Sequence, residues 1–122
     1  MGWFGTVVVG VLAGLLGWAS PALADDSGEA VFNAYCRACH SLSEGVNRVG
    51  PHLAGVVGRQ AGSVPGYAYS EANRNSGITW TEDKLDAYLE NPQAVVPGTK
   101  MTFNGIRDAA RRAALIAYLK TR

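Results

Sequence analysis

Apolar residues recur at helical spacing where the charged part of the chain begins. Asp26 followed by Glu29 resembles a capping box, which marks the start of a helix. Apolar positions then continue with a helical period, and this pattern predicts a first helix that runs into the region of Cys36. The positions expected to carry its apolar surface are Ala30, Val31, Ala34, Tyr35 and Ala38.

A second long helical pattern ends the chain. It starts near Asp108 and runs to Lys120, and its basic residues suit the negative end of a helix dipole. The residues expected to form its buried stripe are Leu115, Tyr118 and Leu119. Those expected to point to water are Arg111, Arg112 and Lys120.

Turn signals dominate the stretch that follows the first helix. Residues 41–63 hold five glycines and Pro51, so this part of the chain is predicted to be mostly loop. The signals continue to Gly66, after which residues 70–75 can form a short helix.

A better helix is predicted over residues 82–90, where Thr81 provides a cap and acidic residues occupy the first turn. Residues 91–104 contain two prolines and Gly98, and they predict an extended loop that carries Met101. No alternating strand pattern of useful length occurs. The predicted fold class is therefore all-α.

The first 24 residues carry no charged side chain and are largely apolar. The segment Ala22-Leu23-Ala24 matches the small-x-small pattern that signal peptidase accepts. We therefore expect residues 1–24 to be a signal peptide that is removed after Ala24, and residues 25–122 to form one domain in the periplasm. An uncleaved membrane anchor over residues 2–19 is the alternative.

The net charge of the chain bears on which kinds of molecule it can bind. The chain has eleven Lys and Arg and ten Asp and Glu, for a formal net charge of +1. This balance lacks the basic surplus typical of nucleic-acid binding, so no nucleic-acid partner is expected. No internal repeat or second domain is visible, and we expect a monomer.

The candidate chemistry lies in a C-x-x-C-H run formed by Cys36, Cys39 and His40. In c-type attachment two thiols add across the vinyl groups of one porphyrin, and the adjacent histidine reaches the iron. Two intervening residues on a helical turn would set the thiols about one vinyl separation apart. The run predicts one covalent haem c, with His40 as an iron ligand.

Three other uses of these residues compete with haem. A structural disulfide would close a tiny loop and leave His40 without a role. A thioredoxin-like pair needs a preceding strand and a βαβ pattern, and neither is visible. A zinc site would also need His52, but the adjacency of Cys39 and His40 does not fit common tetrahedral ligand spacings.

The second axial ligand decides what the iron can do. Met101 is the sole methionine beyond residue 24, and it lies in a stiff Pro/Gly loop, so we expect it to bind the iron. His52 is the rival, and we expect it to be a surface histidine. A thioether raises the reduction potential, and two protein ligands leave no position for oxygen or peroxide. Electron transfer is thus favoured over catalysis.

At this point the residues resemble a known family, the class I cytochromes c, over nearly all of residues 28–120. The matching segments are Cys36 to His40, Gly50 to Leu53, Gly58-Arg59, Asn75 to Trp80, Tyr88 to Pro92, Pro97 to Met101 and Leu115 to Leu119. The resemblance implies a small all-α fold in which the first and last helices cross and loops wrap around one covalent haem.

The resemblance also implies residue roles. It implies that the Pro51 carbonyl accepts a hydrogen bond from His40. Residues that match the surroundings of the haem propionates are Arg59, Tyr69 and Trp80. Residues that match the polar cluster near the methionine sulfur are Asn73, Tyr88 and Thr99. Residues that match the helix crossing are Gly28, Phe32 and Tyr118.

The function implied is a soluble carrier that shuttles electrons from a cytochrome bc complex to a terminal oxidase, reductase or reaction centre. Its mitochondrial form carries a lysine ring around the haem edge. The cations that this chain keeps there are Arg48, Lys100 and Arg107, with Arg37 nearby, and the residues that depart from the ring are Tyr35, Gln93 and Asp108. The alternatives are a haem enzyme with peroxidase-like activity and a membrane-tethered carrier.

Overall fold

The computed structural model describes residues 26–122 and, before them, residues 1, 2, 5, 10, 14 and 17. The residues that define the expected signal peptide, Ala22 to Ala24 among them, lie outside the described residues. Within the described part, no helix is both long enough and apolar enough to cross a membrane.

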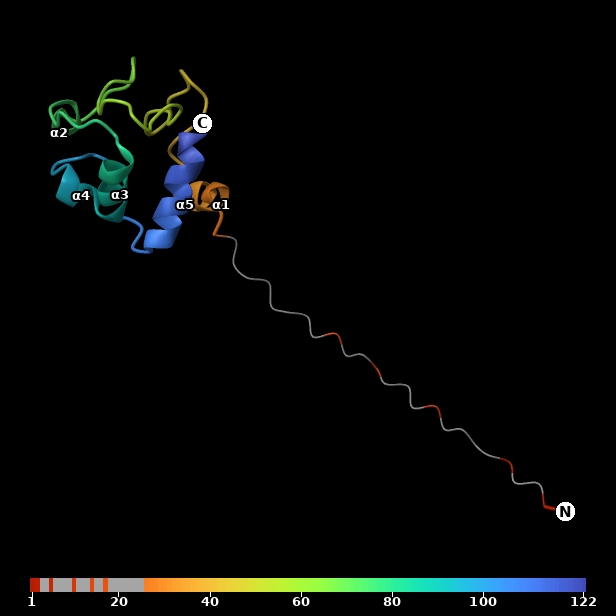
Figure 1. Ribbon diagram of the computed structural model, residues 1–122. Helices are drawn as coiled ribbons and strands as arrows, with labels where there is room; N and C mark the ends of the chain where they lie inside the picture. The colour runs from red at the N-terminus through yellow and green to blue at the C-terminus, as the bar shows by residue number, and fades with distance from the viewer. Residues whose placement is uncertain (3–4, 6–9, 11–13, 15–16, 18–25) are drawn as a thin grey trace.

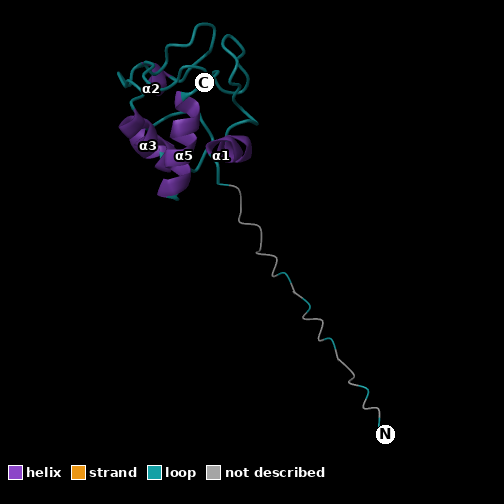
Figure 2. Ribbon diagram, turned by 45° about the vertical axis from the view of Figure 1, so that its right-hand side comes forward, coloured by secondary structure: helices purple, strands orange, loops and turns teal. Residues whose placement is uncertain are grey.

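Five helices and their connecting loops make up the domain. The helices are α1 (Gly28–Tyr35), α2 (Glu71–Arg74), α3 (Glu82–Glu90), α4 (Pro92–Val95) and α5 (Ala109–Lys120). Helix α5 lies between α1 and α3 (Figure 1). The loops between α1 and α3 gather near the C-terminal end of α5 (Figure 1). Over residues 26–122 there is no strand, and the one extended pairing is an isolated bridge between Gln60 and Thr79 (Figure 2). The prediction of an all-α domain is confirmed.

The crossing of α1 and α5 is close because one of its residues has no side chain. A Cβ atom on Gly28 would overlap the carbonyl oxygen of Ala114, so only glycine permits this approach. Beside it the rings of Phe32 and Tyr118 pack with their centroids 5.9 Å apart. Phe32 is 1% exposed and Leu115 is fully buried, so the crossing is also the centre of the core.

The predicted start and apolar face of the first helix need correction. Ser27, not Asp26, caps α1 by accepting a hydrogen bond from the Ala30 amide, and Asp26 instead pairs with Arg111 of α5. The buried residues of α1 are Val31 and Phe32. Ala34, Tyr35 and Ala38, which were expected to carry apolar surface, are exposed because α5 covers the other face and the helix ends at Tyr35.

Arg112 was expected to point to water, and this prediction is wrong. Its side chain is 7% exposed, and its Nε atom lies 2.8 Å from the carboxylate of Asp86 on α3. Its Nη1 atom donates to the carbonyls of Ile106 and Arg107, at 2.9 and 3.0 Å. The hydrogen bond to Ile106 is buried, so this carbonyl depends on a nearby donor.

The loop predicted over residues 91–104 contains one helical turn, α4. Asn91 caps it by accepting from the Ala94 amide, and Pro92 takes the first helical position, where a missing N–H has no cost. The predicted cap Thr81 begins α3 as expected, and Ser70, the first residue of the predicted short helix, caps α2. The prediction of an extended loop is therefore wrong at residues 92–95, where Pro92 begins a helical turn.

Candidate haem site

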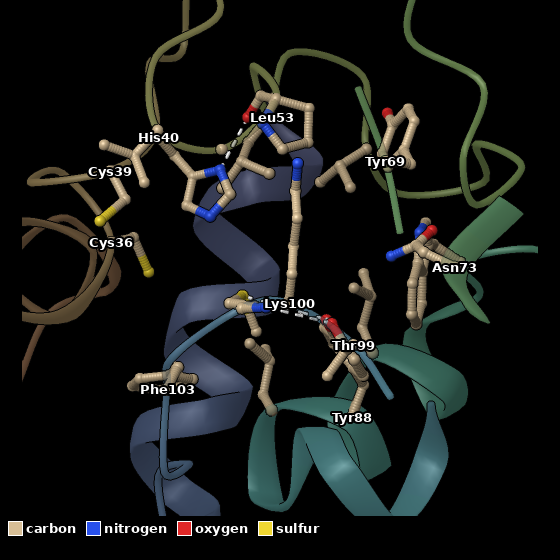
Figure 3. Close-up of a pocket in the computed structure, with 18 of the residues that line it drawn as sticks. Cys36, Cys39, His40, Leu53, Tyr69, Asn73, Tyr88, Thr99, Lys100 and Phe103 are labelled. Atoms are coloured by element: carbon tan, nitrogen blue, oxygen red, sulfur yellow. Dashed lines mark hydrogen bonds between the residues drawn. The ribbon is translucent and has the colours of Figure 1, made fainter. Parts of the chain in front are cut away.

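The two cysteines and His40 lie on a single turn that continues from the end of α1. The amides of Cys39 and His40 both donate to the carbonyl of Cys36, at 3.1 and 2.9 Å. This turn places both sulfurs at the same wall of a cavity, and neither sulfur is in a disulfide (Figure 3). Burial, and the neighbouring Cys39, raise the pKa of the Cys36 thiol to about 12.

The imidazole of His40 is held in one orientation and one tautomer. Its Nδ1 atom lies 2.7 Å from the Pro51 carbonyl, and since a carbonyl can only accept, Nδ1 carries the proton. Gly50 packs directly against the ring, and a Cβ there would overlap it. Burial, aided by the charge of Arg59 and opposed by the Pro51 hydrogen bond, lowers the pKa of His40. The Nε2 atom therefore carries no proton, and its lone pair can bind a metal.

A polar cluster surrounds Met101 at another wall of the cavity. The Tyr88 hydroxyl lies 3.4 Å from the Thr99 Oγ1 atom and 3.9 Å from the Met101 Sδ atom (Figure 3). The amide of Met101 also donates to Thr99 Oγ1, at 3.4 Å. Burial is the main reason why the pKa of Tyr88 is raised, so the phenol stays protonated and can donate. The thioether is thus in a fixed polar setting rather than in a purely apolar one.

All of the residues predicted for the site line one cavity of about 420 Å³. They are Cys36, Cys39, His40, Pro51, Arg59, Tyr69, Asn73, Trp80, Tyr88, Thr99 and Met101. Further lining residues that the sequence did not single out include Leu53, Tyr67, Leu85 and Phe103. Tyr67 could have been predicted from Tyr69. Residues two apart in an extended chain can share a face, so a side chain at position 67 can line the same cavity as one at position 69.

Two side chains, those of Asn73 and His52, lie in surroundings other than those predicted. Asn73 lines the cavity, but its Oδ1 atom is buried without a partner and makes no hydrogen bond to Tyr88 or Thr99. His52, expected at the surface, is 7% exposed. It is not among the residues that line the cavity.

The cavity suits a haem group. Its walls are mainly aliphatic and aromatic, as a macrocycle requires, and two polar atoms in it, Arg59 Nε and Asn73 Oδ1, are buried without hydrogen-bond partners. Unsatisfied buried polar groups are costly, so they indicate a ligand with polar substituents. Within the described residues there is no group of three or more His, Cys, Asp or Glu side chains placed to hold a metal ion.

Comparisons with known proteins agree with this geometry. The family model described as cytochrome c matches residues 26–122. Cytochrome c2 of Blastochloris viridis is 51% identical over 104 residues, which cover 83% of this chain and 81% of that protein. Cytochrome c of Euglena viridis is 50% identical over 96 residues, which cover 79% and 94% of the two chains.

Among solved structures, cytochrome cH from Methylobacterium extorquens has a similar fold. The TM-score is 0.73 with 48% sequence identity, and the match covers 78% of this chain and 95% of that chain. Sequence and fold therefore agree over most of the chain. This chain belongs to the cytochrome c family, whose members bind haem c covalently through a motif such as Cys36 to His40.

Proposed function

We propose that this protein is a one-electron carrier whose single haem c is attached through Cys36 and Cys39 and ligated by His40 and Met101. The observation that carries the proposal is that a deprotonated His40 Nε2 atom and a thioether held by Tyr88 belong to the same cavity. An imidazole and a thioether together favour the reduced iron and raise its potential. Haem supplies the redox chemistry, and the chain supplies attachment, ligands and a water-poor surrounding.

The proposal favours a carrier over a peroxidase-like enzyme because two protein ligands leave the iron no open position. The hydrogen bonds around Met101 support this preference, since they hold the thioether at the cavity. The names of the relatives, cytochrome c2 and cytochrome c, agree with a carrier as well.

For partners, we propose a cytochrome bc complex as electron donor and a terminal oxidase, reductase or reaction centre as acceptor. Tyr35 and Val49 line the cavity and are nevertheless 43% and 74% exposed, so part of the haem site borders the surface. Few cations accompany this opening, and one of them, Lys100, donates to the Ala68 carbonyl and stacks over the Tyr67 ring. Docking would then depend on apolar contacts more than on charge. The location proposed is the periplasm, after removal of residues 1–24.

Two measurements on the purified protein test the proposal. Haem should stay with the polypeptide through acid and organic extraction, which strips non-covalent haem, and the oxidised protein should show the near-infrared band of sulfur-to-iron charge transfer. Loss of haem on extraction would overturn the attachment. Absence of the band, together with ready binding of imidazole to the iron, would favour the enzyme instead.

A further inference from the structure

The loop that carries Met101 begins with a tight turn. We refer to residues 96–108 as the methionine loop. The amide of Thr99 donates to the Val96 carbonyl at 3.0 Å, Pro97 and Gly98 are the two central residues, and Gly98 has a φ of 87°. Proline at the first central position and a glycine with positive φ at the second define a type II turn. Type I and type II turns differ mainly in the orientation of the peptide between these two residues, so whatever holds the Gly98 N–H fixes the turn type.

The side chain of Gln93 holds this turn from outside. Its Oε1 atom accepts a hydrogen bond from the Gly98 amide at 3.4 Å, and its Nε2 atom donates to the Thr99 carbonyl at 3.1 Å. Both ends of one carboxamide thus bond to consecutive residues of the turn. A primary amide carries separate donor and acceptor atoms, whereas neither a lysine nor an aliphatic side chain could make both bonds.

The backbone that carries Gln93 is anchored in the core. Gln93 belongs to α4, and Pro92, the residue before it and the first of this helix, is among the largest fully buried side chains. Asn91 caps the same helical turn through the Ala94 amide. The carboxamide therefore extends from a base anchored in the core, and its hydrogen bonds restrain the turn relative to that core.

The restraint reaches Met101 through Thr99. Gln93 holds the Thr99 carbonyl, while the Thr99 hydroxyl oxygen accepts from the Met101 amide at 3.4 Å. The same oxygen lies 3.4 Å from the Tyr88 hydroxyl, which in turn lies 3.9 Å from the Met101 sulfur. Any opening of the turn that moves Thr99 would disturb both contacts that hold the thioether.

We infer that Gln93 is a positioning residue for Met101, and that its carboxamide controls how often the methionine loop opens and exposes the iron. The inference rests on the proposed function in that Met101 is the iron ligand whose departure exposes the metal. Gln93 is exposed, so its hydrogen bonds restrain a local opening and contribute little to global stability.

The test compares the wild-type ferric holoprotein with Gln93→Ala, which removes both hydrogen bonds, and Gln93→Leu, which keeps bulk without polar atoms. Gln60→Ala is the matched control, because Gln60 is also exposed and its side chain makes no hydrogen bond among the described residues. Three quantities are measured: hydrogen exchange of the Gly98 amide, affinity of the ferric iron for imidazole, and the urea midpoint of global unfolding.

Gln93→Ala and Gln93→Leu should both raise Gly98 exchange and imidazole affinity by roughly tenfold, as expected for the loss of one or two exposed neutral hydrogen bonds. The urea midpoint should stay near that of wild type, and Gln60→Ala should leave all three quantities unchanged. Gly98 exchange and imidazole affinity within about twofold of wild type in both Gln93 variants would overturn the inference. So would a wild-type result for Gln93→Leu alone, because bulk rather than hydrogen bonding would then restrain the loop.

A failure of the proposed ligation gives a different result. If wild type binds imidazole as readily as Met101→Ala, Met101 is not a ligand and control of iron access by Gln93 fails with it. Hydrogen exchange at Gly98 would still report whether Gln93 holds the turn, since that measurement does not depend on the iron.

Discussion

The Nε atom of Arg112 lies 2.8 Å from a carboxylate oxygen of Asp86, and this ion pair joins α5 to α3. The same guanidinium donates to the carbonyls of Ile106 and Arg107, at the end of the methionine loop. One buried cation therefore connects two helices and the loop that carries Met101.

Arg112→Ala should destabilise the protein much more than Arg111→Ala. Arg112→Ala leaves the buried carbonyl of Ile106 and the neighbouring carbonyl of Arg107 without their donor. Arg111→Ala removes a surface pair with Asp26 and a long, exposed hydrogen bond to the Tyr35 hydroxyl, which contribute little. Urea denaturation of both holoproteins measures the difference. Equal midpoints would show that water satisfies the freed carbonyls.

Phe32→Ala should lower the free energy of unfolding by about 3–5 kcal/mol, the usual range for removing a buried aromatic ring from a core. Tyr35→Ala is the control on the same helix, and it should cost no more than about 1.5 kcal/mol, since its ring mainly makes an edge contact with Phe103. The reduction potential should change little in Phe32→Ala. Similar losses of stability in the two variants would mean that α1 buries a different face.

Met101→Ala should lower the reduction potential by an amount on the order of tenths of a volt, within the range that axial ligands control. It should also abolish the near-infrared charge-transfer band and raise peroxidase activity, because exogenous ligands can then reach the iron. Potentiometry and absorption spectra of the variant check this. A potential equal to that of wild type would exclude Met101 as a ligand.

Tyr88 should make stability depend on pH in the alkaline range. Burial raises the pKa of Tyr88 above its ordinary value of 10.0, so the unfolded chain loses this proton first as pH rises. The stability that the neutral phenol contributes is complete below pH 10.0 and is lost as pH rises through the folded pKa. The unfolding free energy of reduced wild type should therefore fall relative to that of Tyr88→Phe as pH rises above 10.0. A constant difference between them would contradict the prediction.

Local signals in the sequence predicted much of the fold and the attachment chemistry. Helices α3 and α5 begin close to their predicted starts at Thr81 and Asp108, because a capping side chain acts over three residues of its own segment. Attachment of haem is local as well, since the thiols and the histidine of Cys36 to His40 lie within one turn. Resemblance to a family, rather than local pattern, supplied the more distant residues such as Arg59 and Tyr88.

The sequence alone did not predict which polar side chains are buried. Arg112 and His52 both read as surface residues, yet both are buried. Whether a charged side chain meets solvent depends on partners far along the chain, and Asp86 is 26 residues from Arg112. Propensity and periodicity contain no information about such pairs.

By itself the sequence determined the cofactor, its covalent attachment and the helical class, because these depend on residues close together in the chain. Only the tertiary structure decided which face of α1 is buried, how Arg112 is paired and how Gln93 holds the turn before Met101. Each of these depends on segments meeting in space: α1 against α5, α5 against α3, and α4 against the methionine loop. The energy of such contacts comes from excluding water and pairing polar groups between segments, and no single segment contains both partners.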